Sequence, residues 1–324
     1  MEETRPEEEF LGSSVDPVLE EPVLSKAERA GFPDWLVAYG WILVAFVAFQ
    51  VIAAIVVVIG LFTKPGADLS TLTSPGGLAD HFDILFLGNS MGQILAFGVL
   101  TLPVIYFVKR RSWSEMLPLN RDPFVWKFTA LASLVILLGA PTVWFIAWLN
   151  TLIPLPAALV EIERQQTEMI EGFLKSDFNV IIALFHVAMV PAICEEILYR
   201  GFALNLLRRT KAAWTAILIT GIIFGFYHLR LSQVIPLAMI GIFLGWITVR
   251  SGSLIPAIVA HFVNNAFSVL LVKFMPDSPL ADSSPEMPPL WLAAGSIVLV
   301  YVVLSYMKRQ TKPGEVSDVW APSQ

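Results

Sequence analysis

Residues 178–200, FNVIIALFHVAMVPAICEEILYR, decide the fold class of this chain. No charged side chain occurs in this stretch before Glu195. A helix rises 1.5 Å per residue, so about 20 mainly apolar residues cross the hydrocarbon core of a bilayer. The stretch therefore predicts a membrane-spanning helix that carries Glu195, Glu196 and Arg200 at membrane depth or just at its edge.

The rest of the chain has the same apolar character. Of its 324 residues, 56 % are hydrophobic and 15 % are charged, whereas ordinary soluble domains carry about 25 % charged residues. The connectors between apolar segments are too short to form a domain core of their own. We therefore expect an all-α membrane protein, a polytopic bundle of about eight transmembrane helices. The predicted spans are 35–62, 84–108, 126–153, 178–207, 213–229, 233–249, 253–274 and 290–307.

The distribution of basic residues predicts the orientation of these spans, because Lys and Arg concentrate in the cytoplasmic loops of membrane proteins. With the N-terminus inside, 15 of the 21 Lys and Arg residues fall on the cytoplasmic side and 5 on the other side. Eight spans then place both termini in the cytoplasm. The first span follows a long acidic stretch and is expected to remain in the protein, unlike a cleaved signal peptide.

The net charge of −6 comes mainly from the N-terminal tail, residues 1–34. A solvated acidic tail accounts for this charge, and it does not indicate a nucleic-acid partner. Cys194 is the single cysteine, so no disulfide forms within the chain. The expected partner of the apolar surface is the lipid bilayer.

Between the third and fourth predicted spans, residues 155–177 alternate apolar and charged side chains at helical spacing. This pattern predicts a short amphipathic helix at the membrane surface. Packing on the surface is the simple interpretation of its role. A cover over an active-site opening is the alternative.

Charged residues in the fourth span need partners or a purpose, because each costs about 2.5–3.5 kcal/mol at a bilayer centre. Glu196 and Arg200 are spaced i, i+4 on a helix and can pair across one turn. Glu195 lies about 100° around the helix from Glu196 and has no local partner. Glu195 is therefore the candidate catalytic carboxylate.

Two other spans place polar residues in apolar surroundings. The fifth carries Phe224 and His228 on one face, next to a G-x-x-x-G pair that permits close helix packing. The seventh carries His261 and Asn265 at i and i+4. Polar side chains within the hydrocarbon core of a membrane are expected to pair with one another. We therefore expect these side chains to share one pocket with Glu195.

Three other reactive residues are not expected in this pocket. His186 lies nine residues before Glu195 and therefore on the opposite side of the helix, which favours a structural role or that of a hydrogen-bond donor supporting the site. His81 lies in a loop before the second span and is expected to be solvated. Cys194 has no basic neighbour to activate its thiol, which argues against a cysteine protease.

Three spaced motifs thus occur in order on separate apolar spans. They are E-E-x-x-x-R at 195–200, F-x-x-x-H at 224–228 and H-x-x-x-N at 261–265. Together they resemble the signature motifs of the CPBP family, the CAAX proteases and bacteriocin-processing enzymes also called the Abi family. The resemblance covers about residues 178–275.

This resemblance implies an intramembrane endopeptidase. In it, Glu195 and His228 activate a water molecule, and His261 and Asn265 stabilise the oxyanion; the supporting residues are Glu196, Arg200 and Phe224. The expected organisation is an acidic cytoplasmic tail (1–34), N-terminal transmembrane helices with an interfacial segment (35–177), the CPBP-like catalytic core (178–275), and the last transmembrane helix with a cytoplasmic tail (276–324).

Metal use has two interpretations. Glu195, His228 and His261 resemble the ligands of a catalytic zinc ion, but the H-E-x-x-H signature is absent and Asn is a poor zinc ligand. We therefore expect a metal-independent mechanism without a cofactor, with zinc as the alternative.

The expected substrate is a membrane-associated peptide or protein, and the family name suggests a prenylated CAAX-like tail. Two non-enzymatic functions are the alternatives. A transporter also places charges inside the membrane, but the broken, repeated helices of that class are not visible in the sequence. A non-catalytic scaffold or bacteriocin-immunity protein would not need all four polar residues.

Overall fold

The computed structural model describes residues 23–64, 77, 81–175, 179–278, 280 and 286–310. The described residues form helices and no β-strand, which confirms the predicted all-α class. Residues 1–22 of the predicted acidic tail and residues 311–324 of the C-terminal tail lie outside this description. The helices outside the fourth span are α1 (Lys26–Arg29), α2 (Asp34–Phe62), α4 (Phe82–Gln93), η1 (Ile94–Val99), α5 (Thr101–Val108), α6 (Trp113–Met116), α7 (Pro123–Thr151), α8 (Ala157–Lys175), α12 (Ala213–Tyr227), η4 (Leu231–Gln233), α13 (Val234–Ser251), α14 (Ile255–Phe274) and α15 (Leu290–Gln310).

Seven helical segments in the described part of the chain are long and apolar enough to cross a membrane. They are Asp34–Phe62, Phe82–Val108, Pro123–Thr151, Val180–Leu207, Leu231–Ser251, Ile255–Phe274 and Leu290–Gln310. These segments agree with seven of the predicted spans to within a few residues.

The predicted fifth span, 213–229, is shorter than expected. Its helix, α12, has 15 residues, which corresponds to about 22 Å at the helical rise and is less than the roughly 30 Å of a bilayer core. The helix ends at Tyr227 because Leu229 adopts a left-handed backbone conformation with φ of 53°. An eighth apolar helix is therefore present, but it is too short to count as a full span.

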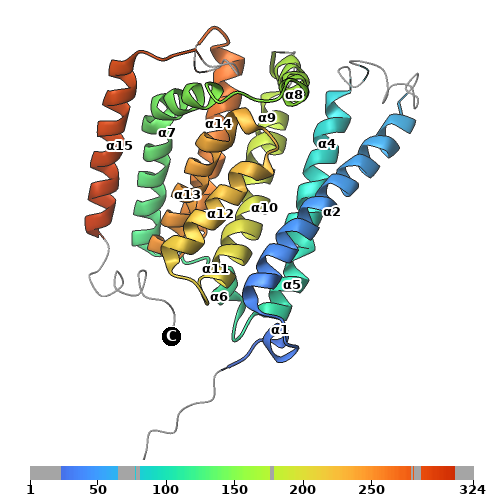
Figure 1. Ribbon diagram of the computed structural model, residues 1–324, viewed down its shortest axis with the longest axis vertical. Helices are drawn as coiled ribbons and strands as arrows, with labels where there is room; N and C mark the ends of the chain where they lie inside the picture. Colours follow the sequence, from blue (N-terminus) through green and yellow to red (C-terminus); the bar gives the residue numbers. More distant parts are fainter. Residues whose placement is uncertain are drawn as a thin grey trace, which may run out of the picture.

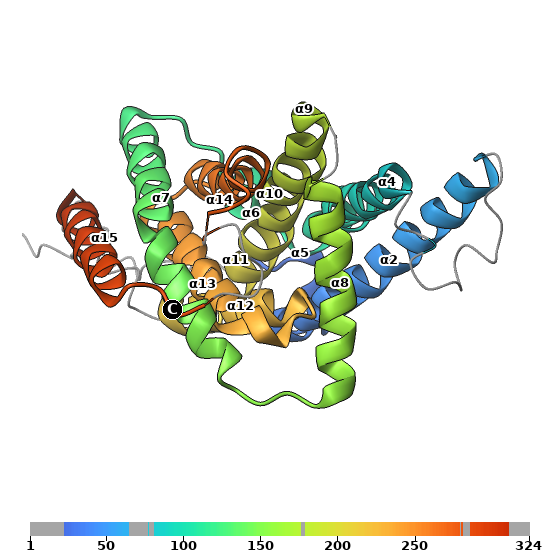
Figure 2. The same cartoon turned by 90° about the horizontal axis from the view of Figure 1, so that it is seen from above.

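The long helices lie side by side, with α15 at one edge of the bundle and α2 at the other (Figure 1). The amphipathic helix α8 crosses one end of the bundle, as the view from above shows (Figure 2). Helix α1 and the C-terminal end of α15 lie at the opposite end (Figure 1). The first and last described residues of the chain thus lie at the same end of the bundle. That this end faces the cytoplasm stays a prediction.

Helices α12 and α13 pack closely because glycines face each other at their contact. A Cβ atom on Gly221 would lie 2.7 Å from the backbone nitrogen of Ile242, and one on Gly225 would lie 2.6 Å from the carbonyl oxygen of Val234. Both contacts are too short for any larger residue. The close packing predicted from the G-x-x-x-G pair is therefore confirmed.

Candidate active site

The fourth span changes helical type around its two glutamates. It runs through α9 (Val180–Ala183), the π-helical turn η2 (Leu184–Met189), α10 (Val190–Glu196), the π-helical turn η3 (Ile197–Leu204) and α11 (Asn205–Leu207). Glu195 and Glu196 end the short α-helical stretch between the two wide turns. Such π-helical turns occur frequently at functional sites.

Glu196 and Arg200 form the predicted pair. Their side chains are completely buried, and Nη1 of Arg200 donates to Oε1 of Glu196 at 2.6 Å. Nη2 of Arg200 donates to the carbonyl oxygen of Gly241 on α13 at 2.8 Å. The guanidinium also lies 4.7 Å from the ring centroid of Phe224. Arg200 therefore ties the fourth span to both α12 and α13.

His261 lies between the two glutamates and is buried. Its Nδ1 is 2.9 Å from Oε1 of Glu196, and its Nε2 is 3.9 Å from Oε2 of Glu195. A carboxylate oxygen only accepts hydrogen bonds, so Nδ1 carries a hydrogen and donates it to Glu196. The other ring nitrogen, Nε2, therefore faces Glu195.

His228 stands at the C-terminal end of α12 beside Phe224. Its Nδ1 lies 2.8 Å from the carbonyl oxygen of Phe224, to which it must donate. This bond leaves Nε2 as the nitrogen with a free lone pair. The ring of Phe224 touches both imidazoles edge to face, with centroids 4.9 Å from His228 and 5.7 Å from His261. Phe224 thus holds the two histidines on one side of the site.

Asn265 projects from α14 toward the fourth span, where a proline has freed a carbonyl group. Pro191 has no N–H, so the carbonyl of Val187, four residues earlier, lacks the donor that a regular helix supplies. Nδ2 of Asn265 donates to this carbonyl oxygen at 3.2 Å. Nδ2 of the neighbouring Asn264 donates to Oδ1 of Asn265 at 3.0 Å. The second hydrogen on Asn265 Nδ2 is not used by either bond.

The structure therefore brings Glu195 and His261 together, and Phe224 contacts both His261 and His228. His186 is tied instead to α4, where the Oγ of Ser90 lies 2.7 Å from its Nδ1, which fits a structural role. His81 directly precedes α4 and is half-buried. Cys194 is a buried free thiol.

Zinc binding was the alternative for three of these residues. In the described part of the chain, no three side chains of His, Cys, Asp or Glu gather closely enough to hold a metal ion. Nδ1 of each imidazole donates to a fixed acceptor, one to a backbone carbonyl and one to Glu196, which leaves Nε2 of both rings available. Zinc-ligating histidines are oriented by bonds of the same kind, so metal use stays a prediction.

Two aromatic residues near the site were not identified from the sequence. Tyr199 packs edge to face on Phe224 with centroids 5.3 Å apart, and Tyr227 packs on His228 with centroids 5.8 Å apart. Their rings pack against Phe224 and His228. In the sequence both look like ordinary apolar residues of a span, and only their adjacency to Arg200 and His228 singles them out.

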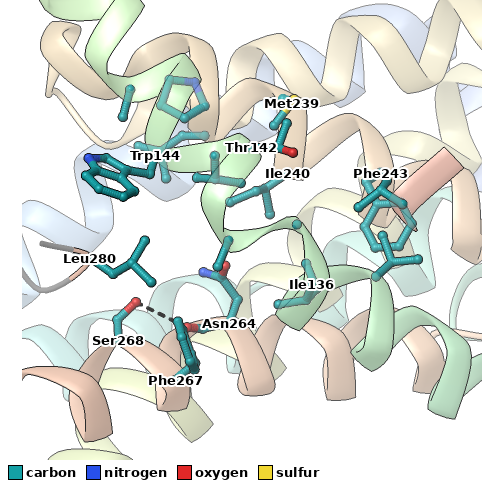
Figure 3. Close-up of a pocket in the computed structure, with 18 of the residues that line it drawn as sticks. Ile136, Thr142, Trp144, Met239, Ile240, Phe243, Asn264, Phe267, Ser268 and Leu280 are labelled. Carbon is teal, nitrogen blue, oxygen red and sulfur yellow. Dashed lines mark hydrogen bonds between the residues drawn. The ribbon is translucent and has the colours of Figure 1, made fainter. Parts of the chain in front are cut away.

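A cavity of about 420 Å³ opens beside α14 (Figure 3). It lies between α7, α13, α14 and α15, and its walls are mostly apolar, including Ile136, Ile240 and Phe243. Its polar lining residues include Thr142, Gln233 and Asn264, and the backbone carbonyl oxygen of Asn264 accepts from Oγ of Ser268 at 3.2 Å. Asn264 also donates to Asn265, but none of the four candidate catalytic residues lines the cavity itself.

Comparison with known proteins yielded one match. Residues 177–267 match the family model described as type II CAAX prenyl endopeptidase Rce1-like. A search of the curated proteins and a search of the solved structures found no match. The matched residues include all four candidate catalytic residues, and the match supports a CAAX-type intramembrane protease in general. The resemblance seen in the three motifs is thereby confirmed for this segment: residues 177–267 of a multi-pass membrane protein match the model of the Rce1-like type II CAAX prenyl endopeptidases.

Proposed function

We propose that this protein hydrolyses a peptide bond of a membrane-associated polypeptide, with Glu195 as general base. One observation carries this proposal. Glu195 is 4 % exposed, and its Oε2 has no hydrogen-bond partner among the described residues, yet it faces Nε2 of His261. An unpaired buried carboxylate is costly, and ionisable residues inside membrane spans mark functional sites.

The reaction begins when the oxygen of a water molecule attacks the carbonyl carbon of the substrate. Glu195 takes a proton from this water, and Nε2 of His228 accepts the second O–H as a hydrogen bond and orients the water. The negative charge moves to the carbonyl oxygen. When the C–N bond breaks, Glu195 gives its proton to the departing amine, so a carboxylic acid and an amine leave the site.

The oxyanion is stabilised by two donors on α14. Asn265 supplies the second hydrogen of Nδ2, while Val187 fixes the carboxamide through the first. Because Nδ1 of His261 already carries a hydrogen, Nε2 donates only when the ring is an imidazolium, and the flanking carboxylates compensate that charge. One such donor is worth about 3 kcal/mol of transition-state stabilisation.

The substrate class follows from the surroundings of the site. Asn264, whose side chain donates to Asn265, lines an apolar cavity, and this cavity offers room for an apolar part of the substrate. We propose a membrane-associated chain, with the prenylated CAAX-like tail named in the family description as the first candidate. Such a chain reaches the site from the bilayer or from its surface.

The test is product identification by mass spectrometry with a peptide library in detergent micelles. We expect wild type to produce new peptide ends and Glu195→Gln to produce none, because glutamine keeps the shape but cannot accept the proton. Glu161→Gln on the exposed face of α8 is the matched control and should behave as wild type. Near-normal turnover by folded Glu195→Gln would remove Glu195 from the mechanism. No products from wild type with any peptide would favour a scaffold or transporter.

A further inference from the structure

The backbone just after His228 is strained. Leu229 has φ of 53° and is the one non-glycine residue with positive φ among those that the structure describes. This conformation is disfavoured for a residue with a Cβ atom. Strained residues persist where their surroundings hold them, and they cluster at functional sites. The contacts that hold this turn therefore bear on the position of His228.

Glu163 of α8 holds the turn from one side. It is 7 % exposed, its Oε1 accepts from the backbone N–H of Leu231 at 2.6 Å, and its Oε2 accepts from that of Ser232 at 3.3 Å. These N–H groups belong to η4, which leads directly into α13, and a carboxylate is favoured at such a helix start by the free donors and by the helix dipole. A buried carboxylate on α8 thus fixes the chain three residues after His228.

Two more contacts hold the same turn. Nη2 of Arg230 donates to Oγ1 of Thr167 at 2.8 Å, and Thr167 lies one turn after Glu163 on the same face of α8. From α7, Asn150 donates to the carbonyl oxygen of Leu231 and accepts from the N–H of Ile235, both at 2.9 Å. The turn is therefore fastened between α7 and α8.

Other side chains of α8 are exposed. Leu159, Val160 and Ile162 are exposed apolar residues, and Arg164 pairs with Glu161 in the solvent-exposed part of the helix. Glu163 is the one acidic side chain of α8 that is buried among those described. This inward-facing carboxylate has no role in the membrane packing expected of an amphipathic helix.

We propose that Glu163 is a positioning residue, which fastens the turn after His228 and thereby keeps Nδ1 of His228 on the carbonyl of Phe224. The proposal rests on the proposed function for its catalytic consequence, but not for its structural claim. When Glu163 is absent, the turn relaxes toward negative φ at Leu229, the imidazole loses its fixed acceptor, and Nε2 no longer presents its lone pair in one direction. Helix α8 thus acts on the reaction without touching the substrate.

The test combines ¹⁵N NMR of the histidine side chains in detergent micelles with steady-state kinetics. Histidine-labelled protein has four imidazoles, and His228→Gln assigns the relevant signals. We expect wild-type His228 to carry its hydrogen on Nδ1 alone. Glu163→Ala should show a mixture of tautomers and a kcat about 10- to 100-fold lower with KM nearly unchanged, as displaced catalytic groups do. Glu163→Gln keeps an acceptor for Leu231 and should restore most of both readouts.

Glu161→Gln on the exposed face of α8 is the matched control and should leave tautomer and kcat unchanged. Thr167→Val removes the hydrogen bond with Arg230 and is a smaller change than Glu163→Ala. It should change the tautomer and kcat in the same direction. This variant provides the test if Glu163→Ala does not fold. A His228 tautomer that stays on Nδ1 in folded Glu163→Ala or Thr167→Val would overturn the proposal. Because the NMR readout needs no substrate, it holds or fails independently of the proposed protease activity.

Discussion

Nδ1 of His261 and the side chain of Arg200 bind the same atom, Oε1 of Glu196. Glu196 therefore compensates the charge of a completely buried guanidinium and also fixes the orientation of an imidazole that faces Glu195. The two neighbouring glutamates have separate tasks: one is tied into the framework of the site, and the other presents a free oxygen to it.

The dual role of Glu196 predicts that stability and activity can be separated. Arg200→Ala leaves Glu196 without its partner, and breaking a buried ion pair costs about 3–5 kcal/mol. Replacing both residues, as in Glu196→Leu with Arg200→Met, removes both charges and should recover most of the thermal stability in detergent. The double variant should still be inactive, because His261 has lost its acceptor. An active double variant would show that Glu196 serves only to balance Arg200.

The close packing of α12 on α13 predicts a sharp difference between two glycines. Gly225→Ala places a Cβ atom 2.6 Å from the carbonyl oxygen of Val234, so the helices must separate, at a cost of about 1–3 kcal/mol. Since Phe224 and His228 lie on α12, activity should fall as well. Gly40→Ala is the control, because nothing lies within 4 Å of a Cβ atom at that position of α2. Equal melting temperatures of the two variants would contradict the predicted contact.

The ion pair at the start of the described chain predicts a dependence of stability on pH. Nη2 of Arg110 lies 2.6 Å from Oε1 of Glu28, and this hydrogen bond lowers the pKa of Glu28 from 4.5 to about 2. A lowered pKa in the folded state stabilises the protein above the unfolded pKa, and the effect is lost as pH falls from about 4.5 to about 2. Glu28→Gln should therefore lower the melting temperature in detergent at pH 7 and have little effect near pH 2. The same difference at both values would contradict this assignment.

Contacts within the site could be predicted from the sequence where both residues lie on the same helix. The pairs Glu196–Arg200 and Phe224–His228 follow from i, i+4 spacing, and both form. The contact of Glu196 with His261 joins residues 65 positions apart, and helical periodicity does not specify which faces of two separate helices meet. The predicted catalytic roles remain predictions, because no contact tests them.

Two further features depend on backbone conformations that the sequence indicates only weakly. The carbonyl of Val187 became available to Asn265 because of Pro191, a residue whose consequence appears only once a neighbouring helix is in place. The early end of α12 depends on positive φ at Leu229, a residue type that rarely adopts it. The motif positions were therefore predictable, whereas the bonds that orient His228 and Asn265 required the fold.

The metal-independent mechanism predicts resistance to chelation. In the proposed reaction Glu195 takes the proton and His228 orients the water, so activity should survive prolonged treatment with a strong chelator, and added zinc should not increase it. A zinc enzyme depends on the ion to lower the pKa of its bound water to about 7 and to polarise the carbonyl, so chelation would silence it. Elemental analysis of purified, active protein should find zinc well below one atom per chain. Stoichiometric zinc that leaves together with activity, and restores it on return, would replace the water-activation scheme with a metal-assisted one and would make Glu195, His228 and His261 its first candidate ligands.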